Sequence, residues 1–204
     1  MKTEFIKSKE RKTEQLLKSK GLQKYDIKRS FSKLVDMPFS SYKEMKKAIS
    51  NKKTSIIINF LNSDNTIFNL IASKNEKIIY LFSLFATYII TFLMIGLAIY
   101  LGNYFLLIAI LWFFLASNFS SYYFNPPLYP FKGRRIADIM LIICILTLIL
   151  SDTYTIPLLA FSYVLIHWSY ALNRRVYKFT LYKRAMESEI LFRLLYIGKY
   201  IKLS

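Results

Sequence analysis

The chain has 204 residues, a formal net charge of +17 at pH 7 and a hydrophobic fraction of 54%. A chain of this length holds at most one membrane domain and one small additional element. High charge and high hydrophobicity coexist here because they are segregated: long uncharged runs fill the middle, and Lys and Arg gather at both ends. The single cysteine, Cys144, excludes an internal disulfide framework and a cysteine-based metal cluster.

The first 77 residues carry 18 Lys and Arg against 8 Asp and Glu, and they predict a small basic α+β element. A charged helix is expected over residues 3–20, ended by Gly21. The capping-box spacing of Ser41 and Glu44 predicts a second helix over 42–49. Two β-branched and aromatic runs, 54–61 and 66–71, flank a group of turn formers. They predict a β-hairpin, with an interfacial helix as the alternative.

Four apolar runs follow, and they predict an all-α polytopic membrane protein with four transmembrane helices arranged as two tight hairpins. The first run, 78–101, has no charge and would span ~36 Å as a helix, against a hydrocarbon core of ~30 Å. A Gly-Asn turn leads into the return run, 104–124. The third run, 136–151, would reach only ~24 Å, so we expect it to extend at its ends, to thin the bilayer or to be shielded by other helices. The fourth run is 155–172.

The predicted organisation is therefore a basic N-terminal region (1–77), a first membrane hairpin (78–124), a Pro-rich linker (125–135), a second hairpin (136–172) and a basic tail (173–204) with an amphipathic helix over 183–196. Lys and Arg number 18, 3 and 8 in the three predicted cytoplasmic segments, and the two tight turns have none. By the positive-inside rule both termini lie on the cytoplasmic side, or on the equivalent side where the chain is synthesised, and the expected location is an inner (plasma) membrane. No cleaved signal peptide is expected, so the first run would act as the insertion signal.

Polar residues recur every four positions in the first run, at Ser83, Thr87 and Thr91, and folding the hairpin brings Asn118 to the depth of Thr87. Small hydroxylated residues allow close helix packing and interhelical hydrogen bonds. The alternative is a polar stripe that lines a pore or cavity in an oligomer.

Asp138 and His167 are the only ionisable candidates in the third and fourth apolar runs, and they lie at equal distances from the centre of the turn between these runs. Antiparallel packing would place them at one depth near the cytoplasmic interface. A proton-sensitive switch or relay is one interpretation, because histidine titrates near neutral pH. The structural alternative is that Asp138 reaches interfacial water or the nearby Arg135.

The basic ends are expected to contact anionic cytoplasmic lipid, a cytosolic protein partner, or both. Direct nucleic acid binding is disfavoured, because aromatic residues are sparse among these cations and no reader motif is present. The residues assigned to this contact are Lys7, Lys9, Arg11, Lys12, Arg134, Arg135, Arg174 and Arg175.

The sequence offers no support for catalysis. The five glycines are never clustered into a phosphate-binding loop, one histidine cannot build a multi-histidine metal site, and no nucleophile motif is present. We therefore expect no catalytic residues, no cofactor and no metal. The leading hypothesis is a self-assembling, non-catalytic membrane platform or sensor that recruits or regulates a cytosolic partner. The alternatives are an oligomeric ion channel or membrane-permeabilising effector, and a structural subunit of a larger membrane complex.

The overall plan resembles the membrane subunit of Kiwa-type bacterial anti-phage systems. The resemblance consists of four predicted spans in a chain of this length, basic cytoplasmic ends, and a composition rich in Lys, Ile and Asn. It covers the whole chain as architecture, and no residue motif carries it. The resemblance implies a membrane sensor that associates with a cytosolic DNA-binding effector and responds to phage infection.

Overall fold

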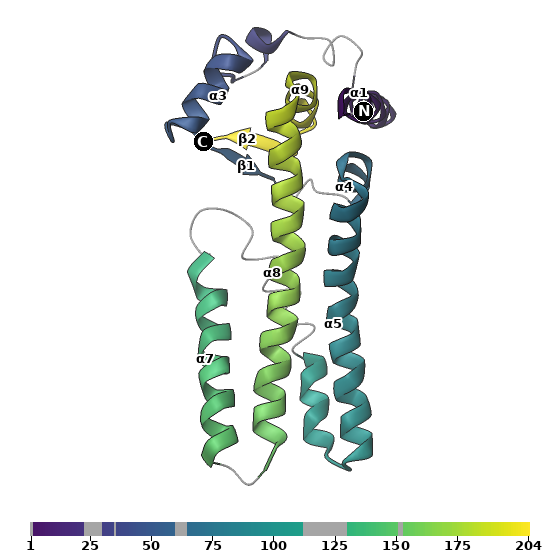
Figure 1. Cartoon of the computed structure of the whole chain (residues 1–204), viewed down its shortest axis with the longest axis vertical. Helices are drawn as coiled ribbons and strands as arrows, with labels where there is room; N and C mark the ends of the chain where they lie inside the picture. The colour runs from purple at the N-terminus through teal and green to yellow at the C-terminus, as the bar shows by residue number, and fades with distance from the viewer. Residues whose placement is uncertain (1, 23–29, 35, 60–64, 112–129, 151–152) are drawn as a thin grey trace. The chain divides into compact units, whose positions relative to one another are not determined.

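The computed structural model describes residues 2–22, 30–34, 36–59, 65–111, 130–150 and 153–204. The described chain is mostly helical and divides into two units (Figure 1). Unit 1 comprises residues 1–77 and 177–204, and unit 2 comprises residues 78–176. Helix α5 (Lys74–Tyr100) starts within the residues of unit 1 and ends in unit 2, and helix α8 (Thr155–Glu187) does the reverse.

Two predicted helices of unit 1 are confirmed. Helix α1 covers Lys2–Ser19, and Gly21 follows it with a φ of 85°, the left-handed conformation that ends helices. Helix α3 covers Tyr42–Ser50. The Ser41 hydroxyl accepts from the Glu44 amide at 3.3 Å, as a capping box requires, and the Glu44 carboxylate also accepts from the backbone amide and the hydroxyl of Ser40.

The predicted β-hairpin is wrong. Strand β1 (Ile56–Ile58) pairs antiparallel with β2 (Ile201–Leu203), which comes from the end of the chain. The second run instead forms helix α4 (Asn65–Ile71). Its apolar residues Ile67, Phe68 and Ile71 are fully buried, with the one- and four-residue spacing of a helix face. Burial against distant segments thus overrode the local preference for a strand.

The predicted single amphipathic helix over 183–196 is also wrong, because two helices meet within it. Helix α8 ends at Glu187, and helix α9 covers Glu189–Ile197. Between them Ser188 has extended backbone, and its hydroxyl accepts the Leu191 amide at 3.2 Å as an N-cap. The cap turns the chain and buries the apolar face of α9 in the core of unit 1.

The core of unit 1 combines residues far apart in the sequence. The ring of Phe31, in the 3₁₀ helix η1 (Phe31–Lys33), lies 5.9 Å from that of Tyr42 and 5.6 Å from that of Phe192. Gly198 follows α9 at a close approach, since a Cβ there would lie 2.6 Å from the Tyr200 ring and 2.9 Å from Leu17. Any larger residue at this position would force the Tyr200 ring and the Leu17 side chain to move.

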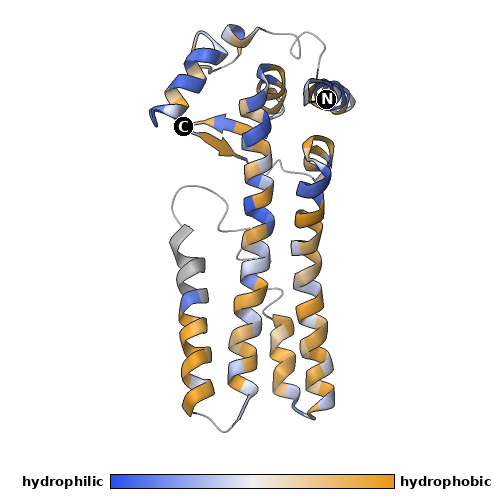
Figure 2. Cartoon of the chain, viewed as in Figure 1, coloured by the Kyte–Doolittle hydropathy of each residue, from blue (hydrophilic) through white to orange (hydrophobic). Residues whose placement is uncertain are grey.

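Among the described residues, two helices, α5 and α8, are long and apolar enough to cross a membrane. Only 17% and 33% of their most apolar windows are buried, so most of this apolar surface is uncovered. Figure 2 shows the hydrophobic residues along both helices. The membrane-protein prediction is thus supported by two candidate spans, not by the four that the sequence predicts. The predicted return run, 104–124, is described only as far as the 3₁₀ helix η3 (Tyr104–Leu107) and the helical residues 108–111. The rest of that run lies outside the described residues.

Helix α7 covers Pro130–Leu150, so the last six residues of the predicted linker are helical. Its apolar portion, Asp138–Leu150, is shorter than a typical span. The turn after α5 matches the predicted Gly-Asn turn, because Gly102 has a φ of 62°. The side-chain Nδ2 of Asn103 donates to the Thr155 hydroxyl at 2.5 Å. The turn is thereby tied to the start of α8.

Candidate functional site

The hydroxyl stripe of α5 lies within unit 2. Ser83 and Thr87 are 1% and 2% exposed, and Thr91 is partly buried. Each hydroxyl donates to a backbone carbonyl of its own helix: Ser83 to Tyr80, Thr87 to Ser83, and Thr91 to Thr87. Asn118, the fourth member of the predicted stripe, lies outside the described residues.

The partner of this stripe is Asn173 on α8, a residue that sequence reasoning did not select. Its amide nitrogen donates to the Tyr80 carbonyl at 3.0 Å and to the Ser83 hydroxyl at 3.2 Å. One side chain therefore bonds two groups of α5 and fixes the register of α5 against α8 within unit 2. The available signal was the position of Asn173, the first polar residue after the fourth apolar run. This arrangement favours the packing interpretation of the stripe.

Asp138 on α7 and His167 on α8 both belong to unit 2, and the Asp138 charge acts on the imidazole. The Tyr163 ring stacks on that of His167 with centroids 6.2 Å apart. Asp138 is exposed, whereas His167 is partly buried. The two groups therefore lie within electrostatic range of each other, and their role as a switch or relay stays a prediction.

The predicted contact cations have different environments. On α1, Lys7, Arg11 and Lys12 are exposed, whereas Lys9 is partly buried and donates to the Ala72 carbonyl at 3.3 Å. On α8, Arg174 is partly buried and Arg175 is exposed. Arg134 and Arg135 lie on α7, and their side chains are outside the described part of the structure.

A buried ion-pair cluster in unit 1 is the most extensive polar arrangement that sequence reasoning missed. The Arg184 side chain is 5% exposed; one of its terminal nitrogens donates to Glu187 at 2.6 Å and the other to Glu76 at 3.0 Å. Its Nε donates to the Ile71 carbonyl at 3.1 Å. The guanidinium group thus joins α8 to the end of α4 and the beginning of α5, a pairing across more than 100 residues.

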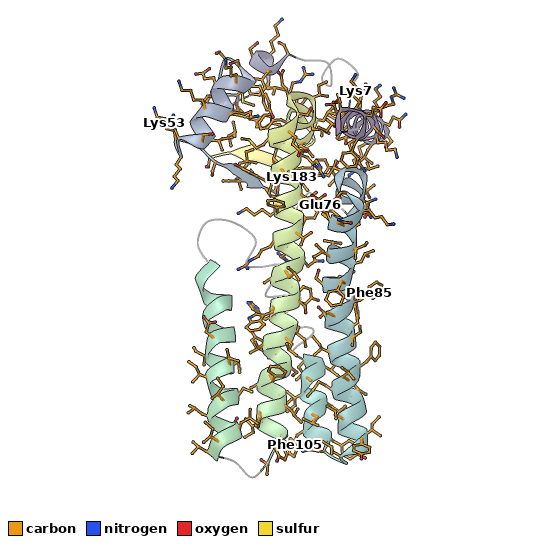
Figure 3. The ribbon with its side chains drawn as sticks, viewed as in Figure 1. Lys7, Lys53, Glu76, Phe85, Phe105 and Lys183 are labelled. Carbon is orange, nitrogen blue, oxygen red and sulfur yellow. The ribbon has the colours of Figure 1, made fainter. Side chains whose placement is uncertain are left out.

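Glu76 is held as a carboxylate from several sides. Burial alone raises its pKa, but hydrogen bonds with Ser73 and the charges of Arg184 and Lys183 outweigh burial, so the pKa of Glu76 lies below its usual value. The Ser73 amide donates to this carboxylate at 2.7 Å, and Lys183 Nζ lies 3.7 Å from it. Figure 3 shows Glu76 on α5 and Lys183 on α8 close to each other.

The Lys9 ammonium lies beside this cluster. Burial, followed by the positive charges of Lys77, Lys12 and Arg184, lowers the pKa of Lys9, and Glu76 opposes the shift only in part. Two cations lie near the ring of Phe5, with Lys9 Nζ 5.0 Å and the Arg184 guanidinium carbon 5.1 Å from its centroid. Lys9 is therefore part of the packed structure of unit 1, unlike the exposed Lys7 and Arg11.

Within the described ranges, no three His, Cys, Asp or Glu side chains gather as a metal site. Cys144 is buried and has a free thiol. No family model matches this chain, and neither a curated protein nor a solved structure shows significant similarity to it. Functional inference therefore depends on the chemistry of the two units.

Proposed function

We propose that this chain is a non-catalytic integral membrane platform, in which unit 2 is embedded in the bilayer and unit 1 presents a basic surface to a cytosolic partner. The observation that carries the proposal is the segregation of surface chemistry. Of the 31 exposed large hydrophobic side chains among the described residues, 28 belong to unit 2. In water this surface would be a severe aggregation liability, whereas lipid tails solvate it favourably.

The four-span topology with cytoplasmic termini is part of this proposal. The positive-inside distribution of Lys and Arg supports the orientation, and the two candidate spans α5 and α8 support membrane insertion. Self-assembly is part of the proposal because the apolar portion of α7 is short. The ends of this helix would otherwise face lipid tails, and helices of neighbouring subunits would cover them. A channel receives less support, because the α5 hydroxyls are bonded within their own helix.

We assign partner recruitment to the outward face of α1. Lys7 and Arg11 are four residues apart on a helix, so they lie on one face, and both are exposed. Phe5 and Lys9 contact the rest of unit 1 and lie on a different face. An acidic surface on a cytosolic protein would complement the exposed pair.

The test is purification of the tagged full chain from native membranes under mild conditions, followed by native mass spectrometry. We expect the chain to resist carbonate extraction and to retain a stoichiometric soluble partner. The double variant K7E/R11E should release that partner, whereas K43E/K47E, an equal charge reversal on α3, should not. Extraction by carbonate would refute membrane insertion, and retention of the partner by K7E/R11E would refute the assigned surface.

An anti-phage role, as the resemblance to Kiwa-type systems implies, belongs to the same proposal. Its test is phage plating on cells that express the full chain together with its co-purifying partner. Lower plating efficiency that requires both proteins and is lost in K7E/R11E would support the role. Unchanged plating across a panel of phages would count against it.

A further inference from the structure

Cationic side chains from three helices of unit 1, α1, α5 and α8, lie within electrostatic range of Lys9. Lys9 and Arg184 lie near the ring of Phe5, and the charges of Lys12 and Lys77 act on Lys9. Lys9 and Lys12 are three residues apart on α1 and so share a helix face. We name Lys9, Lys12 and Lys77 the Lys9 cluster.

The positive charge of this region exceeds the negative charge linked to it. Arg184 and Lys183 both lie against Glu76, and Arg184 also binds Glu187. Glu76 and Glu187 thus stand against five cations, Lys9, Lys12, Lys77, Lys183 and Arg184, and the buried Arg184 is the main partner of both carboxylates. The three ammonium groups of the Lys9 cluster therefore repel one another, and an external anion that approaches from the exposed Lys12 would compensate their charge.

The sequence position of the cluster indicates where that anion comes from. Lys77 directly precedes Ile78, the first residue of the uncharged run of α5. If that run enters the bilayer, as proposed above, Lys77 lies at the edge of the hydrocarbon region, where lipid phosphate groups are found. Basic clusters beside cytoplasmic helix ends are suited to anionic headgroups.

We propose that the Lys9 cluster binds the phosphate group of an anionic phospholipid, and that this contact anchors α1 at the membrane surface. The inference rests on the proposed membrane insertion of unit 2 and adds to it a defined lipid site. Lys7 and Arg11 lie on another face of α1, so lipid at the Lys9 cluster leaves the proposed partner surface uncovered.

The experiment is a native mass spectrometry titration of the full chain in detergent with phosphatidylglycerol, and with phosphatidylcholine as the neutral comparison. Three variants are compared with the unmodified chain: K9Q/K12Q/K77Q, the milder K12Q/K77Q, and K43Q/K46Q/K47Q on α3 as a control with the same loss of charge. K12Q/K77Q keeps the contacts of Lys9 with Ala72 and Phe5, so it guards against loss of folding. Competition by inorganic phosphate and pyrophosphate forms a separate arm.

We expect phosphatidylglycerol to bind more tightly than phosphatidylcholine, and both cluster variants to weaken that binding by about tenfold or more. The α3 control should change it less than about twofold. Equal weakening by the α3 control, or no weakening by either cluster variant, would overturn the proposal. Displacement of the lipid by micromolar pyrophosphate would also overturn it in favour of a soluble phosphate ligand. Membrane insertion is scored separately by carbonate extraction, so its failure would be distinguished from failure of the lipid site.

Discussion

Replacing Arg184 by methionine tests whether the buried ion-pair cluster organises unit 1. The substitution removes three hydrogen bonds and leaves two carboxylates, 13% and 17% exposed, without their main counter-charge. Breaking a buried ion pair from one side costs about 3–5 kcal/mol. The lower end applies here, because Glu76 keeps its bond from the Ser73 amide and both carboxylates reach some solvent. We therefore expect a loss of about 3 kcal/mol in the opening free energy of unit 1.

The assay is hydrogen–deuterium exchange of the full chain in nanodiscs, read on peptides from α9 and β2. A loss of about 3 kcal/mol corresponds to roughly 150-fold faster exchange. The matched control is Lys183→Met, which removes a partly exposed cation 3.7 Å from the same carboxylate and should cost below about 1 kcal/mol. The double variant R184M/E76Q should recover part of the loss, since it removes one stranded charge. Equal exchange in R184M and K183M would refute the argument.

Four further outcomes follow from the described contacts. Ser188→Ala should destabilise unit 1 by about 1–3 kcal/mol, because the Ser188 hydroxyl both caps α9 and donates to Glu10. Ser41→Ala should cost about 1 kcal/mol or less, because the Ser41 hydroxyl acts as a helix cap alone. Hydrogen–deuterium exchange of α9 and α3 should show the larger effect for Ser188→Ala. Thr180→Val should be neutral or stabilising by up to about 1 kcal/mol in thermal unfolding, since the fully buried Thr180 hydroxyl has no hydrogen-bond partner among the described residues. A clear loss of stability would show instead that this hydroxyl is hydrogen-bonded. Asn173→Leu should lower the free energy of unfolding of unit 2 by about 0.6 kcal/mol, and by at most about 2 kcal/mol, in an unfolding titration in mixed micelles. An unchanged free energy would mean that the contact of Asn173 with α5 is dispensable. Because the pKa of Glu76 lies below its unfolded value of 4.5, its contribution is complete above that pH and is lost as pH falls through the folded value; melting of unit 1 should therefore drop below about pH 4.5 more steeply in the unmodified chain than in E76Q.

The elements that sequence reasoning predicted correctly are those with local signals. The Gly21 stop, the Ser41 cap and the Gly102 turn each act within a few residues, so α1, α3 and the turn after α5 are confirmed. The length of the uncharged runs within α5 and α8 is likewise a local property, and it predicts both helices as candidate membrane spans.

The predictions that failed concern elements whose partners lie far away in the sequence. The run 54–61 was predicted as one strand of a hairpin, but its partner strand is the C-terminal Ile201–Leu203. Local turn signals indicate pairing only between neighbouring runs, so they could not identify this partner. Asn173, which bonds the α5 stripe from α8, was missed for the same reason, since it lies 90 residues from Ser83.

Charge gives the clearest division between what the sequence and the tertiary structure determine. The distribution of residue types along the chain established a basic N-terminal region and the segregation of charge from apolar runs, because both follow from counting residues in each stretch. Only the tertiary structure separated the exposed Lys7 and Arg11 from the partly buried Lys9, and only it showed that Arg184 is a buried link between helices. Counting cations cannot reveal this difference, since the role of each charge depends on its burial and on the groups that the fold brings within a few ångströms.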